Sequence, residues 1–304
     1  MRRMSAQRGA VAVTVAILMV AMVGFTAIAV DAGAIWMDRK ELQNSADAAA
    51  LALAQSCAKG TCETDETGMA QDYADGNKRD ENVTVVDVDT DLAAQTVTVV
   101  VSSTREHWFA PVIGHDSTQV VRSATASWGG IGGARVLPLT ASICHLADIT
   151  AGSTVTLYTK DDKVDCIAGN PPHAVPAGFG WLDTEGAADC RVDTEVDGTV
   201  DGIPGNAGPK NSYCAPLMLD LLGEEILMPI YDQATDTGSN AQYHLVGYAH
   251  LRVSAYCFTN EWHGGDSKCT GSKRYVTGTF IRKIDLGADL GGPDYGSTTV
   301  RLTK

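Results

Sequence analysis

One acidic loop carries the residue pattern with the clearest potential for chemistry in this sequence. Its opening follows the D-x-[DN]-x-[DN]-G pattern of a calcium-binding EF-hand loop, with a glutamate at the third position. Carboxylate oxygens at alternate positions suit calcium, and the glycine falls where such a loop must turn. The twelfth position, however, is Pro204 instead of a bidentate glutamate. A calcium site and a solvated acidic turn are both open interpretations, and we assign no metal ligand. The loop residues are Asp193, Glu195, Asp197, Gly198 and Asp201.

Catalytic residue combinations are the second place to look for chemistry. The sequence has neither a G-x-S-x-G nor an H-E-x-x-H motif, which are signatures of α/β-hydrolases and zinc peptidases. His244 and His250 stand six residues apart in a strand-like pattern, and an even spacing puts both on one face of a strand. A shared site and ordinary packing both explain this pair. Carboxylates are abundant, but abundance does not define a glycosidase pair. We therefore expect no enzymatic activity, no catalytic residue and no cofactor.

The cysteines predict structural disulfides. All of them follow an apolar N-terminal segment, and their even number suits an oxidising compartment. We expect Cys57 to pair with Cys62 and Cys257 with Cys269, because short segments close at the smallest entropic cost. Zinc binding is the weaker alternative, since no C-x-x-C occurs. The candidates are Cys57, Cys62, Cys144, Cys166, Cys190, Cys214, Cys257 and Cys269.

The element that places these residues in the cell is the uncharged apolar segment at residues 10–30. A helix rises about 1.5 Å per residue, so about 20 residues cross the roughly 30 Å hydrocarbon core of a bilayer. The segment has that length, which predicts a single transmembrane helix. A cleavable signal peptide is the alternative. Its apolar region is about 7 to 15 residues long and ends in an A-x-A-like site, which the AIAVDAGA stretch matches poorly.

Charge predicts the orientation of the chain. Arg2, Arg3 and Arg8 precede the apolar segment, whereas acidic and basic residues are mixed after it. By the positive-inside rule, residues 1–9 are cytoplasmic and the C-terminal bulk lies outside the plasma membrane. Without the three arginines, 20 basic residues stand against 37 acidic ones, a formal charge of about −17. This acidity argues against nucleic acid and anionic lipid as partners.

The segment after the span is predicted to continue outward as a helical stalk. Residues 31–54 contain no proline, and apolar residues spaced by 7, 4, 3 and 4 positions lie on one helical face. We expect the helix to end at the CAKGTC turn, near Gly60. Packing on the protein's own sheet is the favoured role of the stripe, and contact with a partner helix is the alternative. The stripe comprises Ile35, Leu42, Ala46, Ala49 and Leu53.

Short strands are predicted to follow the stalk. Residues 82–89 and 96–103 alternate β-branched and polar side chains and are typical of a hairpin, and residues 119–128 are typical of a third strand. The apolar face of the helix would cover this small sheet. The sequence therefore predicts a membrane-proximal helix and strand module at residues 31–128.

A glycine-rich stretch and a cysteine-containing region complete the chain. We expect residues 129–134 to form a flexible linker and not a dinucleotide loop, because the full G-x-G-x-x-G pattern is missing. Residues 135–304 contain six of the eight cysteines and several alternating segments. They are predicted to form a mostly β, disulfide-containing exported domain, which makes the fold class α+β.

The first 55 residues or so resemble a known family. The matching residues are Arg8 and Gly9 before the span, Asp31 at its outer end, and Leu42, Gln43, Asn44, Ala46 and Asp47 in the stalk. Together they are similar to the N-terminal region of TadE/TadG-like proteins of Tad (Flp) pilus assembly. The rest of the chain resembles actinobacterial members more loosely, in stretches such as GFGWLD at residues 178–183.

The resemblance implies a membrane-anchored, non-enzymatic component of Tad pilus assembly, with other Tad proteins as partners at the bacterial cell surface. Pilin-like relatives that are processed carry glutamate five residues after the cleavage-site glycine. Thr14 stands there in this chain, so we expect the span to be retained. The D-x-S-x-S metal site of relatives with a von Willebrand A domain is absent, so their adhesive mechanism is not carried over. The alternatives are a cell-surface binding module on a shared anchor and a secreted hydrolase.

Overall fold

The computed structural model describes residues 8–303, except 81, 146–151, 160–165, 170, 177, 204–207, 209–213, 236–240, 259–261 and 266–273. The chain divides into two compact units. Unit 1 contains the chain up to Ala54, then Glu63–Ala126, and the residues from Leu302 onward. Unit 2 contains Gln55–Cys62 and Ser127–Arg301. The first unit combines helices with a small sheet and the second is mostly β, so the predicted α+β class is confirmed.

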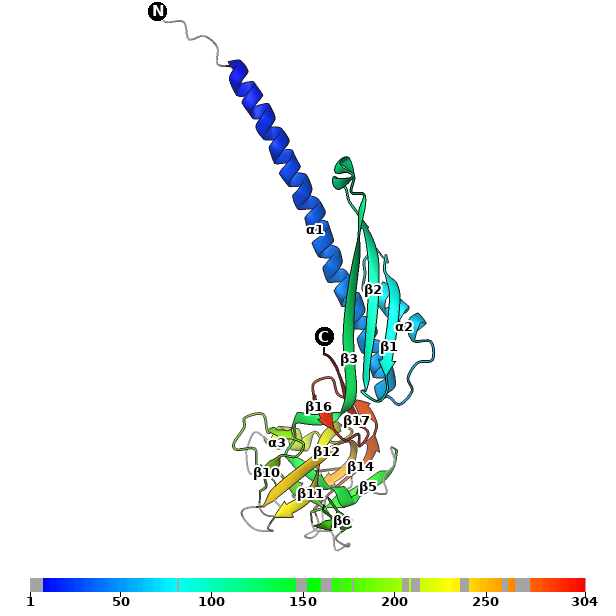
Figure 1. Cartoon of the computed structure of the whole chain (residues 1–304). Coiled ribbons are helices and arrows are strands. Elements are labelled where there is room, and N and C mark those ends of the chain that lie inside the picture. The colour runs from blue at the N-terminus through cyan, green and yellow to red at the C-terminus, as the bar shows by residue number, and fades with distance from the viewer. Residues whose placement is uncertain are drawn as a thin grey trace, which may run out of the picture. The chain divides into compact units, whose positions relative to one another are not determined.

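Unit 1 is built on one long helix and a β-hairpin (Figure 1). Strands β1 and β2 pair antiparallel, from Thr84 opposite Ser102 to Asp91 opposite Thr96, which confirms the predicted hairpin. Strand β3 lies next to β2 in the same sheet. The elements are α1 (Arg8–Ala58), α2 (Glu66–Asp75), β1 (Thr84–Asp91), β2 (Thr96–Glu106), the 3-10 helix η1 (Ala110–Ile113) and the first half of β3 (Ser117–Val136).

The end of α1 and the start of α2 follow local sequence signals. Helix α1 ends at Ala58, and Gly60 takes the left-handed conformation with φ +81°, as the CAKGTC turn predicts. Helix α2 was not expected from the sequence. Its first turn is capped by Asp65, whose side chain accepts the N–H of Gly68 at 2.9 Å. This cap therefore stabilises a short helix whose amphipathic pattern is weak.

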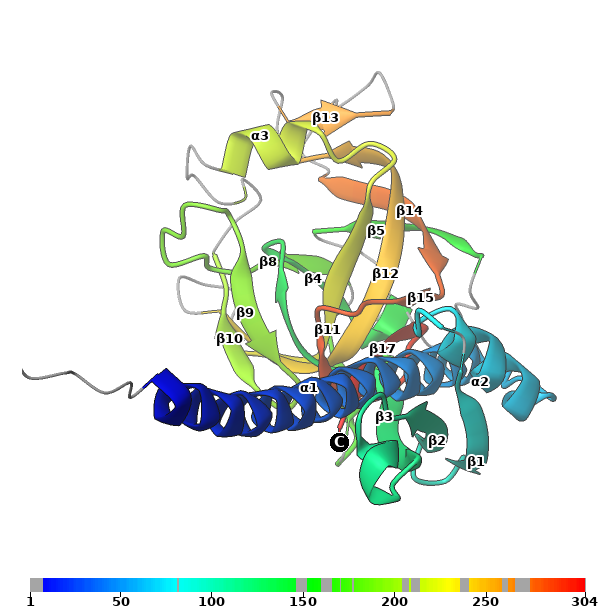
Figure 2. The ribbon, with the colours of Figure 1, turned by 90° about the horizontal axis from the view of Figure 1, so that it is seen from above.

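Unit 2 contains a sheet with the strand order β5-β14-β12-β11-β4-β8 (Figure 2). Neighbouring strands are antiparallel except β11 and β4, which are parallel. The elements of unit 2, after the second half of β3, are β4 (Leu139–Ser142), η2 (Ile143–His145), β5 (Thr154–Tyr158), β6 (Cys166–Ala168), β7 (His173–Val175), β8 (Phe179–Trp181), β9 (Val192–Glu195), β10 (Thr199–Asp201), α3 (Cys214–Leu219), β11 (Glu225–Thr235), β12 (Gln242–Cys257), β13 (His263–Gly264), β14 (Tyr275–Ile281), β15 (Lys283–Ile284), β16 (Asp289–Gly292) and β17 (Ser297–Leu302).

Aromatic side chains form the centre of the unit 2 core. Trp181 and Phe258 are fully buried, and their rings meet edge to face with centroids 4.8 Å apart. Leu251 on β12 and Met228 on β11 are also fully buried in this cluster. The long central strands therefore carry the core, as expected from their alternating apolar pattern.

The expectation of a flexible linker at residues 129–134 is wrong, because β3 runs through this stretch without a break. Its glycines pair with β16, with Gly130 opposite Gly292 and Gly133 opposite Asp289. A Cβ at Gly132 would lie 2.7 Å from the carbonyl oxygen of Leu290. The glycines therefore permit a close approach of two backbones, which is a role that glycine also has in strands.

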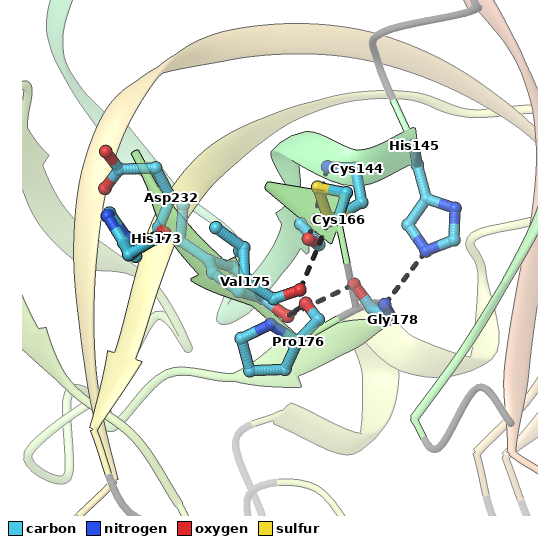
Figure 3. Close-up of a disulfide and its surroundings, with 10 residues drawn as sticks. Cys144, His145, Cys166, His173, Val175, Pro176, Gly178 and Asp232 are labelled. Carbon is cyan, nitrogen blue, oxygen red and sulfur yellow. Dashed lines mark hydrogen bonds between the residues drawn. A yellow bond between two sulfur atoms is a disulfide. The ribbon is translucent and has the colours of Figure 1, made fainter. Parts of the chain in front are cut away.

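Three disulfides are present among the described residues: Cys57–Cys62, Cys144–Cys166 and Cys190–Cys214. The predicted Cys57–Cys62 pair is thus confirmed. Cys269 lies outside the described residues, so its pairing with Cys257 stays a prediction. Around Cys144 and Cys166, His145 Nε2 accepts the N–H of Gly178 at 2.9 Å (Figure 3). The disulfide joins η2 to β6, which indicates a structural role.

Candidate membrane anchor and the contacts that hold it

Helix α1 is the one helix among the described residues that is long and apolar enough to cross a membrane. Residues 11–30 carry no charge. Almost every side chain in this range is exposed, so that no face of the helix is buried there. A helix that is apolar all round is stable in a bilayer or in a protein core, and not in water. The first part of α1 therefore has the properties of a membrane anchor.

The second part of α1 is a packed helix within unit 1. Leu42, Ala46, Ala49 and Leu53 are between 0% and 2% exposed. Their spacing of 4, 3 and 4 residues places them on one face. Gln43 Nε2, next to this face, donates to the carbonyl oxygen of Ser123 on β3 at 3.2 Å. Four of the five residues of the predicted apolar stripe are therefore buried within their own unit, and Ile35 is half-buried.

Asp31 marks the change from the exposed to the packed part of the helix. Its carboxylate accepts three backbone N–H groups from the connection between β2 and β3: Trp108 at 2.9 Å, Phe109 at 3.1 Å and Ala110 at 2.7 Å. These N–H groups lie at the start of η1, where Phe109 provides no side-chain cap. An N-terminal helix turn leaves such N–H groups without internal partners. Asp31 thus caps η1 from a different helix.

This capping keeps the Asp31 carboxylate ionised. Burial by itself raises the pKa of the carboxyl group, but the hydrogen bonds from Trp108, Ala110 and Phe109 outweigh it, so the pKa lies below its ordinary value. The negative charge is balanced by the N–H dipoles at the start of η1. A carboxylate at this position is therefore a stable component of the structure despite its burial.

Asp38 is a second buried carboxylate, two helical turns after Asp31 on the same face. It binds Lys78 Nζ at 2.7 Å and accepts the hydroxyl of Ser103 on β2 at 2.5 Å. Lys78 has a fully buried side chain and also binds Asp80 at 2.6 Å. Burial lowers the pKa of Lys78, but the hydrogen bonds with Asp38 and Asp80 raise it further, so the net shift is upward. This cluster links α1 to the sheet and to the loop before β1.

The family-motif residues named in the sequence analysis divide between these contacts. Leu42 and Ala46 belong to the buried stripe, and Gln43 Nε2 also donates to Asp47 Oδ1 at 2.8 Å. Asn44 is exposed, and Arg8 and Gly9 begin α1. Asp38, Lys78 and Ser103 were missed. The available signal was the seven-residue spacing of Asp31 and Asp38, which places two carboxylates on one helical face.

The two predicted histidines have separate partners in unit 2. His244 Nδ1 lies 2.7 Å from Asp232 Oδ1, whereas His250 is buried and its Nδ1 lies 2.8 Å from Ser297 Oγ. Burial lowers the pKa of His250 to about 4, so it is neutral at physiological pH. The structure therefore assigns each of them an ordinary hydrogen-bonding role and does not bring them together.

The predicted acidic loop forms β9, a turn and β10. Asp193 pairs with Arg135 on β3, and Asp197 occupies the turn with φ +61°. Among the described residues, no group of three or more histidine, cysteine or acidic side chains is placed to hold a metal ion. The structure thus shows part of this loop engaged in an ion pair.

A groove of about 730 Å³ in unit 2 carries charges of both signs. Glu225 at its edge binds Lys283 at 2.8 Å and also pairs with Arg252. These hydrogen bonds, Lys283 first, lower the pKa of Glu225 to about 2. Glu225 is therefore paired with two basic side chains at this groove.

Comparison with known proteins finds a family match on the helix of the candidate anchor. Residues 9–56 match the model of the family described as putative Flp pilus-assembly TadE/G-like, which confirms the resemblance for nearly all of α1. Neither a curated protein nor a solved structure matches the chain. The match thus covers Asp31, Asp38 and the buried stripe. It includes almost none of unit 2.

Proposed function

We propose that this protein is a single-pass, membrane-anchored and non-enzymatic component of Tad (Flp) pilus assembly, with its C-terminal bulk outside the cytoplasm. The observation that carries the proposal is the family match on α1, which is also the exposed apolar helix. The partners are other Tad assembly proteins. Its contribution is to hold the exported units at the membrane surface, where a pilus is assembled.

The orientation is supported by two independent features. Arg2, Arg3 and Arg8 lie before the span, which favours a cytoplasmic N-terminus. The disulfides lie after it, and disulfides persist in oxidising compartments outside the cytoplasm. Protease treatment of intact spheroplasts tests this, because digestion of the C-terminal bulk is expected while a tag before Arg2 stays protected. Protection of the bulk would refute the orientation.

The role in piliation is tested by deletion and complementation. We expect deletion of the gene to reduce the number of pili in electron micrographs and the full chain to restore it. A chain in which a cleavable signal peptide replaces residues 1–30 exports residues 31–304 without an anchor, and we expect it not to restore pili. Unchanged piliation after deletion would refute the assembly role. If piliation is unchanged and the chain binds purified cell wall, the surface-binding alternative is favoured.

A further inference from the structure

The connection between β2 and β3 exposes an unusual concentration of apolar side chains. Within residues 108–113, named here the apolar loop, Trp108 is 72% exposed, Val112 90% and Ile113 74%, and Phe109 is also exposed. Pro111 lies in the first turn of η1 and fixes the local backbone. No charged residue occurs in the loop, and the nearest ones are Glu106 and Asp116. In water this arrangement is unfavourable, because the loop buries little of its apolar surface.

The position of the apolar loop relative to the span is fixed by Asp31. This residue directly follows the apolar segment, and its carboxylate holds the N–H groups of Trp108, Phe109 and Ala110. The loop backbone is therefore level with the point at which α1 leaves the apolar segment. Figure 1 shows the connection between β2 and β3 at the end of these strands that lies nearest the N-terminal half of α1.

The composition of the loop suits the boundary between hydrocarbon and water. Tryptophan prefers this zone because its ring is apolar and its indole N–H is polar. Trp36, one and a half turns after Asp31 on α1, is 63% exposed and has Lys40 Nζ 5.9 Å from its ring centroid. Two exposed tryptophans thus lie close to the end of the span, as in an aromatic belt.

We propose that the apolar loop inserts into the interface of the same bilayer that α1 spans, and so makes a second contact between unit 1 and the membrane. The occupant of the exposed surface is zwitterionic lipid, because the loop is uncharged and is continuous with the lipid-facing part of α1. This proposal rests on α1 spanning a membrane. Each fully buried valine or isoleucine side chain favours the inserted position by about tenfold or more in population. Two points of attachment then restrict the rotation and tilt of unit 1.

Photo-cross-linking to lipid tests the proposal in the full chain. A diazirine amino acid replaces one residue at a time, and the chain is reconstituted in phosphatidylcholine nanodiscs. Position 112 reports on the loop, because the side chain of Val112 is exposed and its replacement disturbs no packing. Position 20 reports on the span, since Val20 is 76% exposed. Position 92 is the control, because Leu92 is an exposed apolar residue in the turn between β1 and β2.

The expected result is lipid adducts at positions 20 and 112 in similar yield, with about tenfold less at position 92. Adducts at position 20 together with background yield at position 112 would overturn the proposal and leave the membrane anchor intact. Cross-links from position 112 to a protein would also overturn it, because the loop would then be a protein interface. Background yield at position 20 would refute the anchor itself and the proposed function with it.

Discussion

Removing either partner of the buried Asp38–Lys78 pair is expected to destabilise unit 1. Breaking a buried ion pair from one side costs about 3–5 kcal/mol, because one charge stays buried without compensation. We expect Asp38→Leu to lie near the lower limit, at about 3 kcal/mol, since Asp80 still binds Lys78 Nζ at 2.6 Å. Lys78→Met is expected to cost a similar amount, because it leaves the Asp38 carboxylate with Ser103 as its remaining partner.

The double variant distinguishes an ion pair from two independent packing defects. With both charges replaced by apolar side chains, no uncompensated charge remains, so the double variant is expected to cost no more than either single one. The coupling free energy is then about 3 kcal/mol, a value typical of residues in direct contact. The pair of the exposed Arg79 and the half-buried Glu41, 3.3 Å apart, provides the control, and Glu41→Gln is expected to change stability by less than about 1 kcal/mol.

Hydrogen exchange in the full chain, reconstituted in nanodiscs, measures these effects. An opening free energy lower by 3 kcal/mol speeds exchange of the β2 amides by about 100-fold. The upward shift of the Lys78 pKa adds a pH dependence. Its stabilisation is fully present below the ordinary value of 10.5 and is lost as pH rises through the higher value in the folded state. Additive single-variant effects, or equal exchange in Asp38→Leu and Glu41→Gln, would refute the reasoning.

Three further predictions concern other contacts. Asp31→Asn is expected to speed amide exchange in the apolar loop, because the amide group presents an N–H where the carboxylate accepts, and unchanged exchange would contradict the capping role. In the wild type, faster exchange of the loop is expected only as pH falls below about 3.8 towards the lower pKa of Asp31 in the folded state. Gly132→Ala is expected to lower the stability of unit 2 in thermal melting by about 1–3 kcal/mol, because its Cβ meets a backbone carbonyl. Gly287→Ala is the near-neutral control, since its Cβ would meet only a side-chain oxygen at 3.4 Å. Non-reducing peptide mapping is expected to recover the three disulfides of the described residues and, from the sequence prediction, Cys257–Cys269; a different pairing would contradict the arrangement of the loops.

The two parts of α1 differ in how their side chains are surrounded. Up to Val30 its side chains face outward on every side, whereas from Asp31 onward one face is buried. The carboxylate of Asp31 stands at this change, and its hydrogen bonds tie the connection between β2 and β3 to the helix at that level. The apolar part and the packed part of α1 are therefore continuous in a single helix, without an intervening linker.

Local patterns in the sequence were sufficient for several elements. The apolar segment at residues 10–30, the alanine-rich stripe, the β1–β2 hairpin and the Cys57–Cys62 pair each depend on neighbours within a few residues. Periodicity, length and short loop closure report such neighbours directly. For the same reason the glycines at residues 129–134 were misleading, because composition alone indicates flexibility and cannot show that β16 lies against them.

Only the tertiary structure brought together residues that are far apart in the chain. Asp31 meets Trp108 across 77 positions, Asp38 meets Lys78 across 40, and Cys190 pairs with Cys214 across 24. Asp31 by itself reads as a polar residue that ends a span, and residues 108–113 read as an apolar connector. The sequence alone was sufficient to predict an apolar helix long enough to cross a membrane. The fold decided that Asp31, at the end of the apolar segment, holds residues 108–110, because long-range packing and hydrogen bonding, and not local pattern, set which segments meet.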